Sequence, residues 1–338
     1  MIKKFDQILK NKTIVVAEIG QAHEGSVNIA HSYIDACADA GADIIKFQTH
    51  YALEESTLDE PFRVKFSYND KTRFDYWKRM EFSPKEWKSL SNHAKRRGIL
   101  FMSSVFSERA FNVVKNLEYC AWKIPSGEIT NYSLLDKIIK TQKPIIVSTG
   151  LSDLDEIKKI TNYLKRKKAK YILLQCTSKY PTSLEEVGMN NMFLFKKFSN
   201  YVGLSDHSGT IFPSVYASAN GASLVEIHVT FDKKMFGVDT PSSININDLK
   251  ILTNFTKKFS ILKNSDVNKN SNKKYKKIFS RSICVNRIIK KGEKIEAKDI
   301  ILKKPGGGIN PTSIKKVINK IAKKDISPLR ILRLNDLL

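Results

Sequence analysis

The sequence predicts an α/β fold: a closed (β/α)8 TIM barrel followed by a small C-terminal module. Over about the first 260 residues, short β-branched runs alternate with longer amphipathic stretches. Eight strand–helix pairs in about 250 residues match the number of units and the length of such a barrel. The last part of the chain then changes character, with short strands and the turns KKGE and PGGG.

The elements follow one another in a regular order. Predicted strands, each an apolar run, cover residues 13–19, 43–48, 99–104, 121–124, 144–149, 171–176, 201–205 and 223–229. Predicted helices cover residues 27–40, 84–97, 107–117, 132–140, 153–167, 191–198, 212–220 and 245–259. An open doubly wound sheet is the alternative, but AEIGQAHEGS after the first strand lacks the GxGxxG phosphate turn of that fold.

Two segments depart from the repeating pattern. The aromatic stretch YNDKTRFDYWKRMEF, residues 68–82, is too long for a plain connection, and such insertions often cover an active site. The run KNSDVNKNSNKKYKK has no apolar period and is typical of a solvated linker. We therefore expect a barrel domain at 1–262, a linker at 263–279 and a small module at 280–338 with a short helix near PTSIKKVINKI.

The composition limits the function classes. The formal charge is +24, but 23 basic against 6 acidic residues from Thr256 onward account for most of it, so we expect no nucleic-acid partner. No apolar run approaches the roughly 20 residues of a membrane helix, and MIKKFDQILKNK is unlike a signal peptide. Four cysteines without a CxxC pair indicate neither a disulfide framework nor a zinc finger. We expect a cytoplasmic protein without a membrane partner.

Every predicted strand ends in polar residues, and the C-terminal strand ends are where barrels carry their chemistry. In DIIKFQ, Lys46 and Gln48 share one face, and in VEIHV, Glu226 and His228 share one face. The other polar residues at or just after strand ends are Glu18, Ser103, Ser104, Lys123, Ser126, Glu128, Ser148, Thr149, Thr177, Ser178, Tyr180, Ser205, Asp206 and His207.

These residue types suggest two kinds of ligand. Lys46 and Lys123, with Ser104, Ser126, Ser148 and Ser205, form a potential cradle for a phosphate and a carboxylate on one small molecule; structural ion pairs with Glu18 or Glu128 are the alternative.

The second kind of ligand that these residue types suggest is a metal ion. His207 of GLSDHSG and His228 follow neighbouring strands, so both imidazoles can reach one divalent metal, with Mn, Zn, Co and Fe left open. The alternative for His207 is a hydrogen-bonding residue in a turn. Glu128 and Glu226 are candidates for acid/base or orienting roles.

The strings around these residues resemble the sialic acid synthase family, the phosphoenolpyruvate-dependent synthases of nine-carbon 2-keto sugar acids. The matching strings, in order, are AEIGQAHEGS, GADIIKFQTH, WKIPSGE, PIIVSTG, QCTSKYP, GLSDHSG and VEIHVTFDKKMFGVD. The tail resembles the antifreeze-like (SAF) domain that these enzymes carry. The resemblance therefore covers almost the whole chain.

The resemblance implies a transferase that joins phosphoenolpyruvate to the open-chain aldehyde of an N-acylated hexosamine, N-acetylmannosamine first, by C–C bond formation and C–O cleavage that releases phosphate. It implies a divalent metal, Mn²⁺ first with Mg²⁺ or Co²⁺ as alternatives, held by His207 and His228. It assigns catalytic roles to Glu18, Lys123, Glu128 and Glu226. The substrate-binding positions that it implies are Lys46, Gln48, Ser104, Ser126, Ser148, Ser178, Tyr180, Ser205, Asp239 and Lys304.

This chain departs from the family pattern at Ala22, Val105, Ser178 and Lys304, the last standing where an arginine reaches into a partner subunit's site. These changes leave the acceptor sugar open, so a legionaminic or pseudaminic acid synthase that uses a 2,4-diacetamido sugar is the alternative. A noncatalytic basic protein that binds an acidic polymer is a third hypothesis. The family resemblance also implies a homodimer with a domain-swapped tail module.

Overall fold

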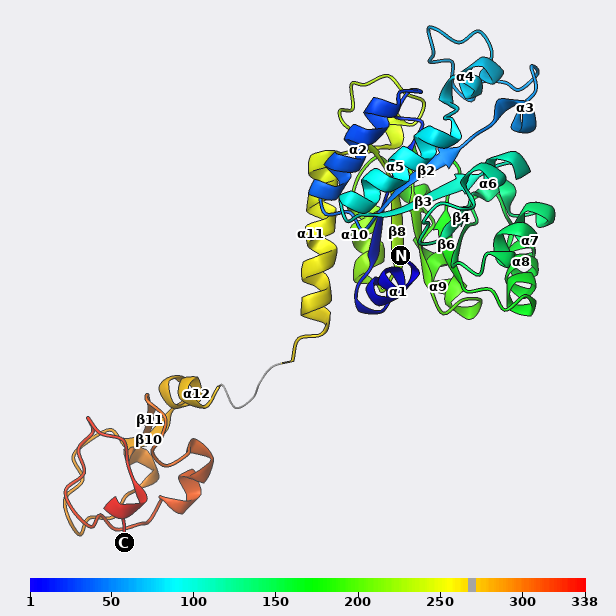
Figure 1. Ribbon diagram of the computed structural model, residues 1–338. Helices are drawn as coiled ribbons and strands as arrows, with labels where there is room; N and C mark the ends of the chain where they lie inside the picture. Colours follow the sequence, from blue (N-terminus) through cyan, green and yellow to red (C-terminus); the bar gives the residue numbers. More distant parts are fainter. Residues whose placement is uncertain (267–271) are drawn as a thin grey trace. The chain divides into compact units, whose positions relative to one another are not determined.

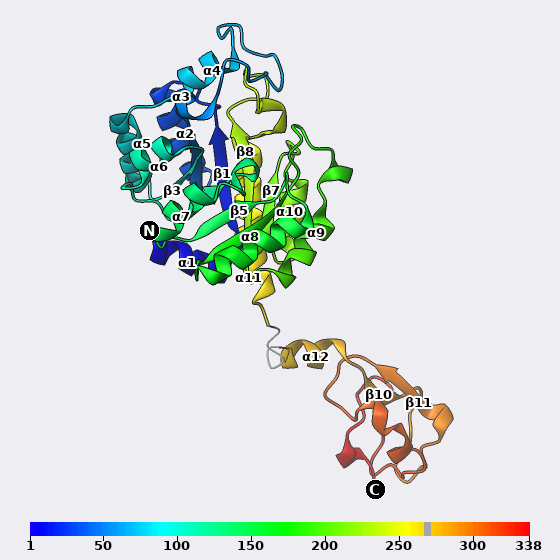
Figure 2. The same cartoon turned by 90° about the vertical axis from the view of Figure 1, so that its right-hand side faces the viewer.

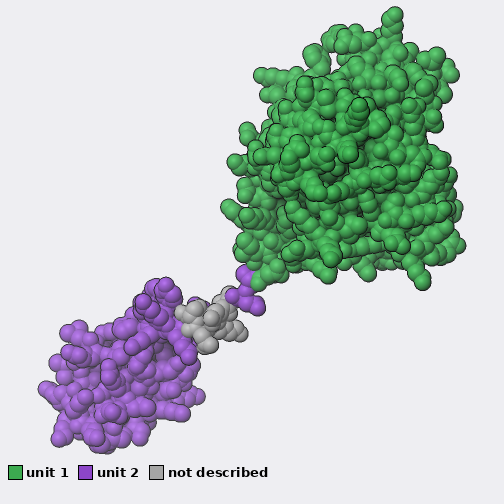
Figure 3. Space-filling model, viewed as in Figure 1, with its two compact units in different colours: residues 1–264 green, residues 265–338 purple. Residues whose placement is uncertain are grey.

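The structure of the protein, a computed structural model, describes residues 1–266 and 272–338. The chain divides into two compact units, Met1–Asn264 and Ser265–Leu338 (Figure 3). Each unit has a buried apolar cluster of its own.

The first unit is a closed barrel of eight parallel strands, and it confirms the predicted TIM barrel. Strand order follows chain order, and the barrel closes because β1 pairs with both β2 and β8. The strands are β1 (Ile14–Gly20), β2 (Ile44–Thr49), β3 (Leu100–Val105), β4 (Trp122–Ile124), β5 (Ile145–Ser148), β6 (Tyr171–Cys176), β7 (Val202–Asp206) and β8 (Leu224–Thr230). A two-residue strand, β9 (Ile244–Asn245), pairs with the end of β8.

Helices surround the strands in the order that the sequence predicts (Figures 1 and 2). In the first unit they are α1 (Ile2–Asn11), α2 (Val27–Asp39), α3 (Ala52–Glu55), α4 (Arg73–Met80), α5 (Pro84–Arg96), α6 (Glu108–Val114), α7 (Tyr132–Lys140), α8 (Leu154–Arg166), α9 (Met189–Leu194), α10 (Phe212–Ala219) and α11 (Ile246–Lys263). α8 illustrates how they form: Asp153 caps its first turn, and Ile157, Ile160 and Leu164 form its buried face.

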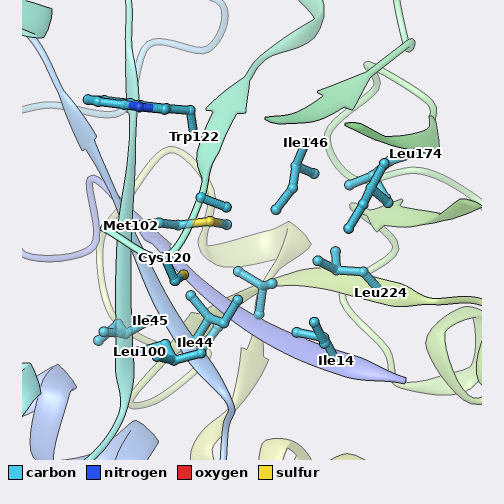
Figure 4. Packing of buried hydrophobic residues seen from close by; sticks show 14 of the residues in the cluster. Ile14, Ile44, Ile45, Leu100, Met102, Cys120, Trp122, Ile146, Leu174 and Leu224 are labelled. Atoms are coloured by element: carbon cyan, nitrogen blue, oxygen red, sulfur yellow. The ribbon is translucent and has the colours of Figure 1, made fainter. Parts of the chain in front are cut away.

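Apolar side chains fill the barrel near the N-terminal ends of the strands. Ile14, Ile44, Leu100 and Leu224 each begin a strand, are almost fully buried and lie close together (Figure 4). This packing leaves the opposite end, where the strands finish in polar residues, for the site.

The N-terminal helix α1 was not predicted, because its frequent charges hide an apolar face. Phe5 and Leu9 are buried on that face. In both ribbon views α1 lies at the end of the barrel opposite α3 and α4 (Figures 1 and 2). The insertion at 68–82 likewise contains a helix, α4, which a capping box of Thr72 and Asp75 starts.

The second unit is a small module built on an antiparallel pair, β10 (Ser282–Val285) and β11 (Ile300–Lys303). The linker prediction is wrong for part of its length: α12 (Lys273–Phe279) is helical and stacks Tyr275 on Phe279. Residues 267–271 of the predicted linker lie outside the described residues. The short helix expected near residue 311 is a 3-10 helix, Pro311–Lys316.

Candidate active site

Strand register brings the predicted residues together at the C-terminal mouth of the barrel. Glu18 on β1 is paired in register with Lys46 on β2 and with His228 on β8. Ser104 is paired with both Gln48 and Lys123, and Ser205 with Glu226. Residues in register on parallel strands point to the same face of the sheet. Side chains scattered over the sequence therefore meet inside one mouth.

Most of them line a cavity of about 210 Å³, here called the lysine chamber. It contains two lysines, two glutamates, two histidines and several hydroxyl groups. The predicted residues that line it are Glu18, Lys46, Gln48, Ser104, Lys123, Ser126, Ser148, Ser178, Tyr180, Ser205, His207, Glu226 and His228.

The lysines form the ion pairs that were considered as the alternative to an anion cradle. Lys46 is paired with Glu18 and lies 3.7 Å from Oε1 of Glu226, while Lys123 Nζ is 3.2 Å from that same oxygen. The partner of Lys123 is thus Glu226, and the suggested pairing of a lysine with Glu128 is wrong. Lys46 also donates to Ser104 Oγ at 3.2 Å.

The pKa values of the two glutamates shift in opposite directions. Burial raises the pKa of Glu18, although Lys46 opposes the effect. Burial also opposes ionisation of Glu226, but Lys123 and Lys46 together lower its pKa below the ordinary value. The chamber therefore contains one carboxylate that stays ionised and one that can take a proton.

Several buried polar atoms of the lysine chamber have no hydrogen-bond partner anywhere in the described parts of the chain. They are Ser148 Oγ, Glu226 Oε2 and His228 Nδ1. A buried polar group without a partner costs about 1–3 kcal/mol, so such groups cluster where a ligand or water satisfies them. The lysine chamber has the polar lining of a binding site.

The two histidines fit a metal site with open positions. Their ring centroids are 5.4 Å apart. His207 Nδ1 lies 2.8 Å from the carbonyl oxygen of Thr177, which can only accept, so in the neutral imidazole Nε2 keeps the free lone pair. Burial lowers the pKa of His228 to about 4, so this imidazole is neutral near pH 7. Across residues 1–266 and 272–338, no three His, Cys, Asp or Glu side chains converge as a ligand set, so substrate or water would complete the coordination of a bound ion.

A second cavity of about 360 Å³, here called the aromatic chamber, adjoins the first. Its walls include Phe62, Phe66, Tyr76, Trp77 and Phe106. It shares Gln48, Tyr180, His228 and Pro125 with the lysine chamber. The two chambers therefore adjoin one another at these shared side chains.

The remaining predicted carboxylates belong to the aromatic chamber. Glu128 accepts a hydrogen bond from Asn131 at 2.8 Å, and burial raises its pKa. Asp239 Oδ2 lies 4.0 Å from His228 Nδ1. Gln48 donates to Glu18 at 2.7 Å, so it links this chamber to the lysine chamber.

Among the predicted site residues, Lys304 lies outside the first unit. It belongs to the second unit, where its Nζ lies 5.6 Å from the ring centroid of Phe279.

Among the described residues, no helix combines the length and the apolar character that crossing a membrane requires.

Sequence reasoning missed several residues of the site. Gln21, His50 and Arg63 line the aromatic chamber. His50 directly follows a strand, a position that could have indicated it, whereas Arg63 lies in an irregular segment without a recognisable period. Cys176 was also missed; its Sγ is 4.0 Å from His207 Nδ1.

Gly150 packs closely against residues that line the lysine chamber. A Cβ atom at this position would lie 2.4 Å from Ser178 Oγ and 2.8 Å from Cys176 Sγ, so a side chain does not fit there.

Comparison with known proteins identifies the family. The sequence pattern of the NeuB family matches residues 33–268, which is most of the barrel. The chain belongs to the NeuB family. The SAF domain pattern matches residues 280–338, which confirms the predicted antifreeze-like module of this NeuB-family chain.

Two relatives are similar over almost their whole length. The N,N'-diacetyllegionaminic acid synthase of Campylobacter jejuni is 34% identical and covers 95% of this chain and 99% of its own. A pseudaminic acid synthase of the same species is 33% identical over 93% of this chain and 94% of its own.

A solved structure of a protein from this class is also similar to the chain. The N-acetylneuraminic acid (sialic acid) synthetase of Leptospira borgpetersenii superposes with a TM-score of 0.68 at 29% identity, over 78% of this chain and 90% of its own. The prediction of an enzyme of the nonulosonic acid synthase class is confirmed at this level.

Proposed function

We propose that the chain condenses phosphoenolpyruvate with the open-chain aldehyde of an N-acylated hexosamine, giving a nine-carbon 2-keto sugar acid and phosphate. The observation that carries this proposal is the pair of adjoining chambers, one polar with unsatisfied buried groups and one aromatic, that share Gln48, Tyr180 and His228. A two-substrate condensation needs two such compartments with a common boundary.

The lysine chamber suits phosphoenolpyruvate. Its lysines and the hydroxyls of Ser104, Ser126, Ser148 and Ser205 are donors for phosphate and carboxylate oxygens. Lys46 and Lys123 are balanced by Glu18 and Glu226, so a trianionic ligand gains most when Glu18 is protonated and a divalent cation is present.

The aromatic chamber suits a neutral sugar. Several of its ionisable side chains already have a partner: His50 contacts Glu55, Arg73 contacts Glu60 and Arg63 contacts Asp239. An apolar wall with a few fixed polar groups is typical of small-molecule sites.

In the proposed reaction, C3 of phosphoenolpyruvate forms a bond with the aldehyde carbon of the sugar, and water adds to the cation that this leaves at C2. The resulting hemiketal phosphate then expels phosphate by C–O cleavage, which leaves the ketone. The aldehyde oxygen takes a proton during the first step. Glu18 is suited to hold that proton, because burial raises its pKa and Gln48 fixes its orientation at the boundary of the chambers. Lys123 keeps Glu226 ionised beside the phosphoenolpyruvate position.

The histidines are proposed to hold a divalent metal, Mn²⁺ first with Mg²⁺ or Co²⁺ as alternatives. When bound, such an ion would supply Lewis-acid polarisation of the aldehyde. Removing metal with a chelator should abolish turnover, and Mn²⁺ should restore it. The His207→Gln variant should lose metal, measured by elemental analysis, while a His31→Gln surface control should keep it. Full turnover of a verified metal-free enzyme would refute the role given to these histidines.

Two acceptor sugars are candidates. N-acetylmannosamine is the acceptor expected from the sequence. The names of the two Campylobacter jejuni relatives, which match nearly the full chain, support a 2,4-diacetamido sugar as the second candidate. Phosphate release from phosphoenolpyruvate should be assayed with a panel of 2-acetamido and 2,4-diacetamido hexoses. We expect kcat/KM for one class to exceed the other by at least tenfold; no release with any member would refute the proposed function.

A further inference from the structure

Arg63 bridges two walls of the aromatic chamber. It lies in the irregular segment between α3 and α4. Its Nη2 donates to Asp239 Oδ1 at 2.6 Å and to the carbonyl oxygen of Val238 at 3.2 Å. Its guanidinium also lies 4.1 Å from the ring centroid of Tyr180. A stacked, ion-paired guanidinium is held in one orientation.

Arg63 keeps hydrogen-bonding capacity toward the chamber. Through the described ranges 1–266 and 272–338, its Nε and Nη1 atoms make no hydrogen bond, and its side chain is 34% exposed. The other arginine of the chamber, Arg73, is committed differently: Nε contacts Glu60 at 3.1 Å, and Nη1 donates to the Pro61 carbonyl at 3.0 Å. Arg63 is thus the better placed of the two to donate to a ligand.

We propose that Arg63 is a specificity-determining residue for the acceptor sugar, donating from Nε or Nη1 to the carbonyl oxygen of its N-acyl group. This inference rests on the proposed function. Amide carbonyl oxygens are strong neutral acceptors, and a charged donor prefers them to hydroxyl groups. Tyr180 and Asp239, which hold Arg63, also line the chamber, so the guanidinium is fixed before the sugar arrives.

The alternative is that Arg63 only braces Asp239. Lysine separates the two roles, because it keeps the charge and can reach a carboxylate but cannot fork across a second acceptor. A bracing role predicts that Arg63→Lys behaves like the parent enzyme. If Arg63 instead recognises the N-acyl group, Arg63→Lys should lose affinity for N-acylated sugars only.

The test measures sugar binding and turnover separately. Trp77 lines the chamber, whereas Trp87 and Trp122 are buried in the core, so tryptophan fluorescence reports sugar binding there, with Trp77→Phe as the control for the signal. N-acetylmannosamine, a 2,4-diacetamido hexose and mannose are each titrated into the full-length protein. Arg63→Lys should weaken binding of the two N-acyl sugars about tenfold or more, leaving mannose binding and the KM for phosphoenolpyruvate unchanged.

The matched control is Arg97→Lys, an exposed arginine paired with Asp35 and Asp39 that should bind all sugars normally. Equal affinity of Arg63→Lys and the parent for N-acyl sugars would overturn the inference and leave the proposed function intact. Sugar binding that depends on Arg63 without any phosphate release would refute the proposed function and retain the inference. If no N-acyl sugar changes the Trp77 signal of the parent, the inference fails.

Discussion

Lys46 is an unusual residue for the interior of a barrel, since it is only 2% exposed. It is tolerated because Glu18 and Glu226 compensate its charge and Ser104 accepts a hydrogen bond from it. Because these buried charges compensate one another, we expect stability to be sensitive to the removal of any one of them.

Removing Lys46 alone should therefore be costly. Lys46→Met leaves two buried carboxylates with less compensation and should lower the free energy of unfolding by about 3–5 kcal/mol. Adding Glu18→Gln should recover part of this loss without recovering activity. Urea unfolding of the single and double variants measures the effect.

The control is Lys78→Met, whose lysine is exposed and paired with Glu81, where about 0.5 kcal/mol or less is expected. A Lys46→Met protein that is as stable as the parent would show that the ion pairs do not compensate each other as described.

His23 gives a pH-dependent contribution to stability. It is buried between aromatic rings, with the Phe82 centroid 4.6 Å away, and accepts from the Gly25 amide at 3.1 Å. Burial, followed by His50 and Arg79, lowers its pKa to about 3. Below about pH 6.5 the unfolded chain takes up a proton that the folded protein does not, so stability falls as pH falls toward 3, by at most about 1.4 kcal/mol per pH unit.

The His23→Asn variant should lose this part of the slope. Urea unfolding midpoints of the variant and the parent are measured at pH 7, 6, 5 and 4, and the difference between the two proteins is taken at each pH. The contribution of the carboxylates to the pH dependence is common to both proteins and cancels in this difference. Curves that stay parallel across this range would contradict a neutral, buried His23.

At this scale the sequence predicted the lysine chamber well and the aromatic chamber poorly. Lys46, His207 and His228 stand at or just after strand ends, where a period of two fixes which residues face the mouth. Arg63 and Trp77 enter their chamber from a segment whose path depends on tertiary contacts, such as Arg79 with Asp70 and Glu24. No local period encodes such a path.

Strand register is the element-scale feature that assembles the site. Residues far apart in the chain become neighbours because each strand is one step further around a closed barrel. The positions of the strands could be predicted from the β-branched runs in the sequence. Their register could not, because it depends on how whole strands pack. The helices at the opposite end contribute only stability.

α1 illustrates that division. Phe5 is fully buried in the main core, and α1 lies at the end of the barrel away from the chambers (Figures 1 and 2). Phe5→Ala should lower the free energy of unfolding by about 3–5 kcal/mol because it leaves a cavity. Activity per folded molecule should stay unchanged, while the exposed control Ile2→Ala should cost less than about 1 kcal/mol.

Thermal or urea unfolding with activity assays below the transition measures both quantities. A large loss of kcat/KM in the folded Phe5→Ala protein would contradict the separation of stability and chemistry between the two ends.

At the scale of the whole molecule, the chain combines two units that each have a core. The barrel cluster runs from Phe5 to Leu252, and the module cluster centres on Ile283, Val285 and Leu332. The sequence predicted both because the periodic pattern stops before the module and resumes in a different form. The α12 helix escaped prediction because its lysines obscure the spacing of Tyr275 and Phe279.

Deleting residues from 265 onward should therefore leave a folded barrel. We expect such a barrel to have little activity, because the family resemblance implies a homodimer in which the partner's module covers each site. Circular dichroism, light scattering and phosphate release measure folding, assembly and activity in turn. A truncated chain with full activity would rule out the capping role.

The adjoining chambers are proposed to perform a condensation with C–O cleavage. The most direct measurement uses phosphoenolpyruvate labelled with ¹⁸O at its bridging oxygen, incubated with the enzyme, Mn²⁺ and an N-acylated hexosamine, followed by mass analysis of the phosphate. Phosphate should be released only when the acceptor is present, and it should carry the label. Unlabelled phosphate, or release that does not depend on an acceptor, would contradict it.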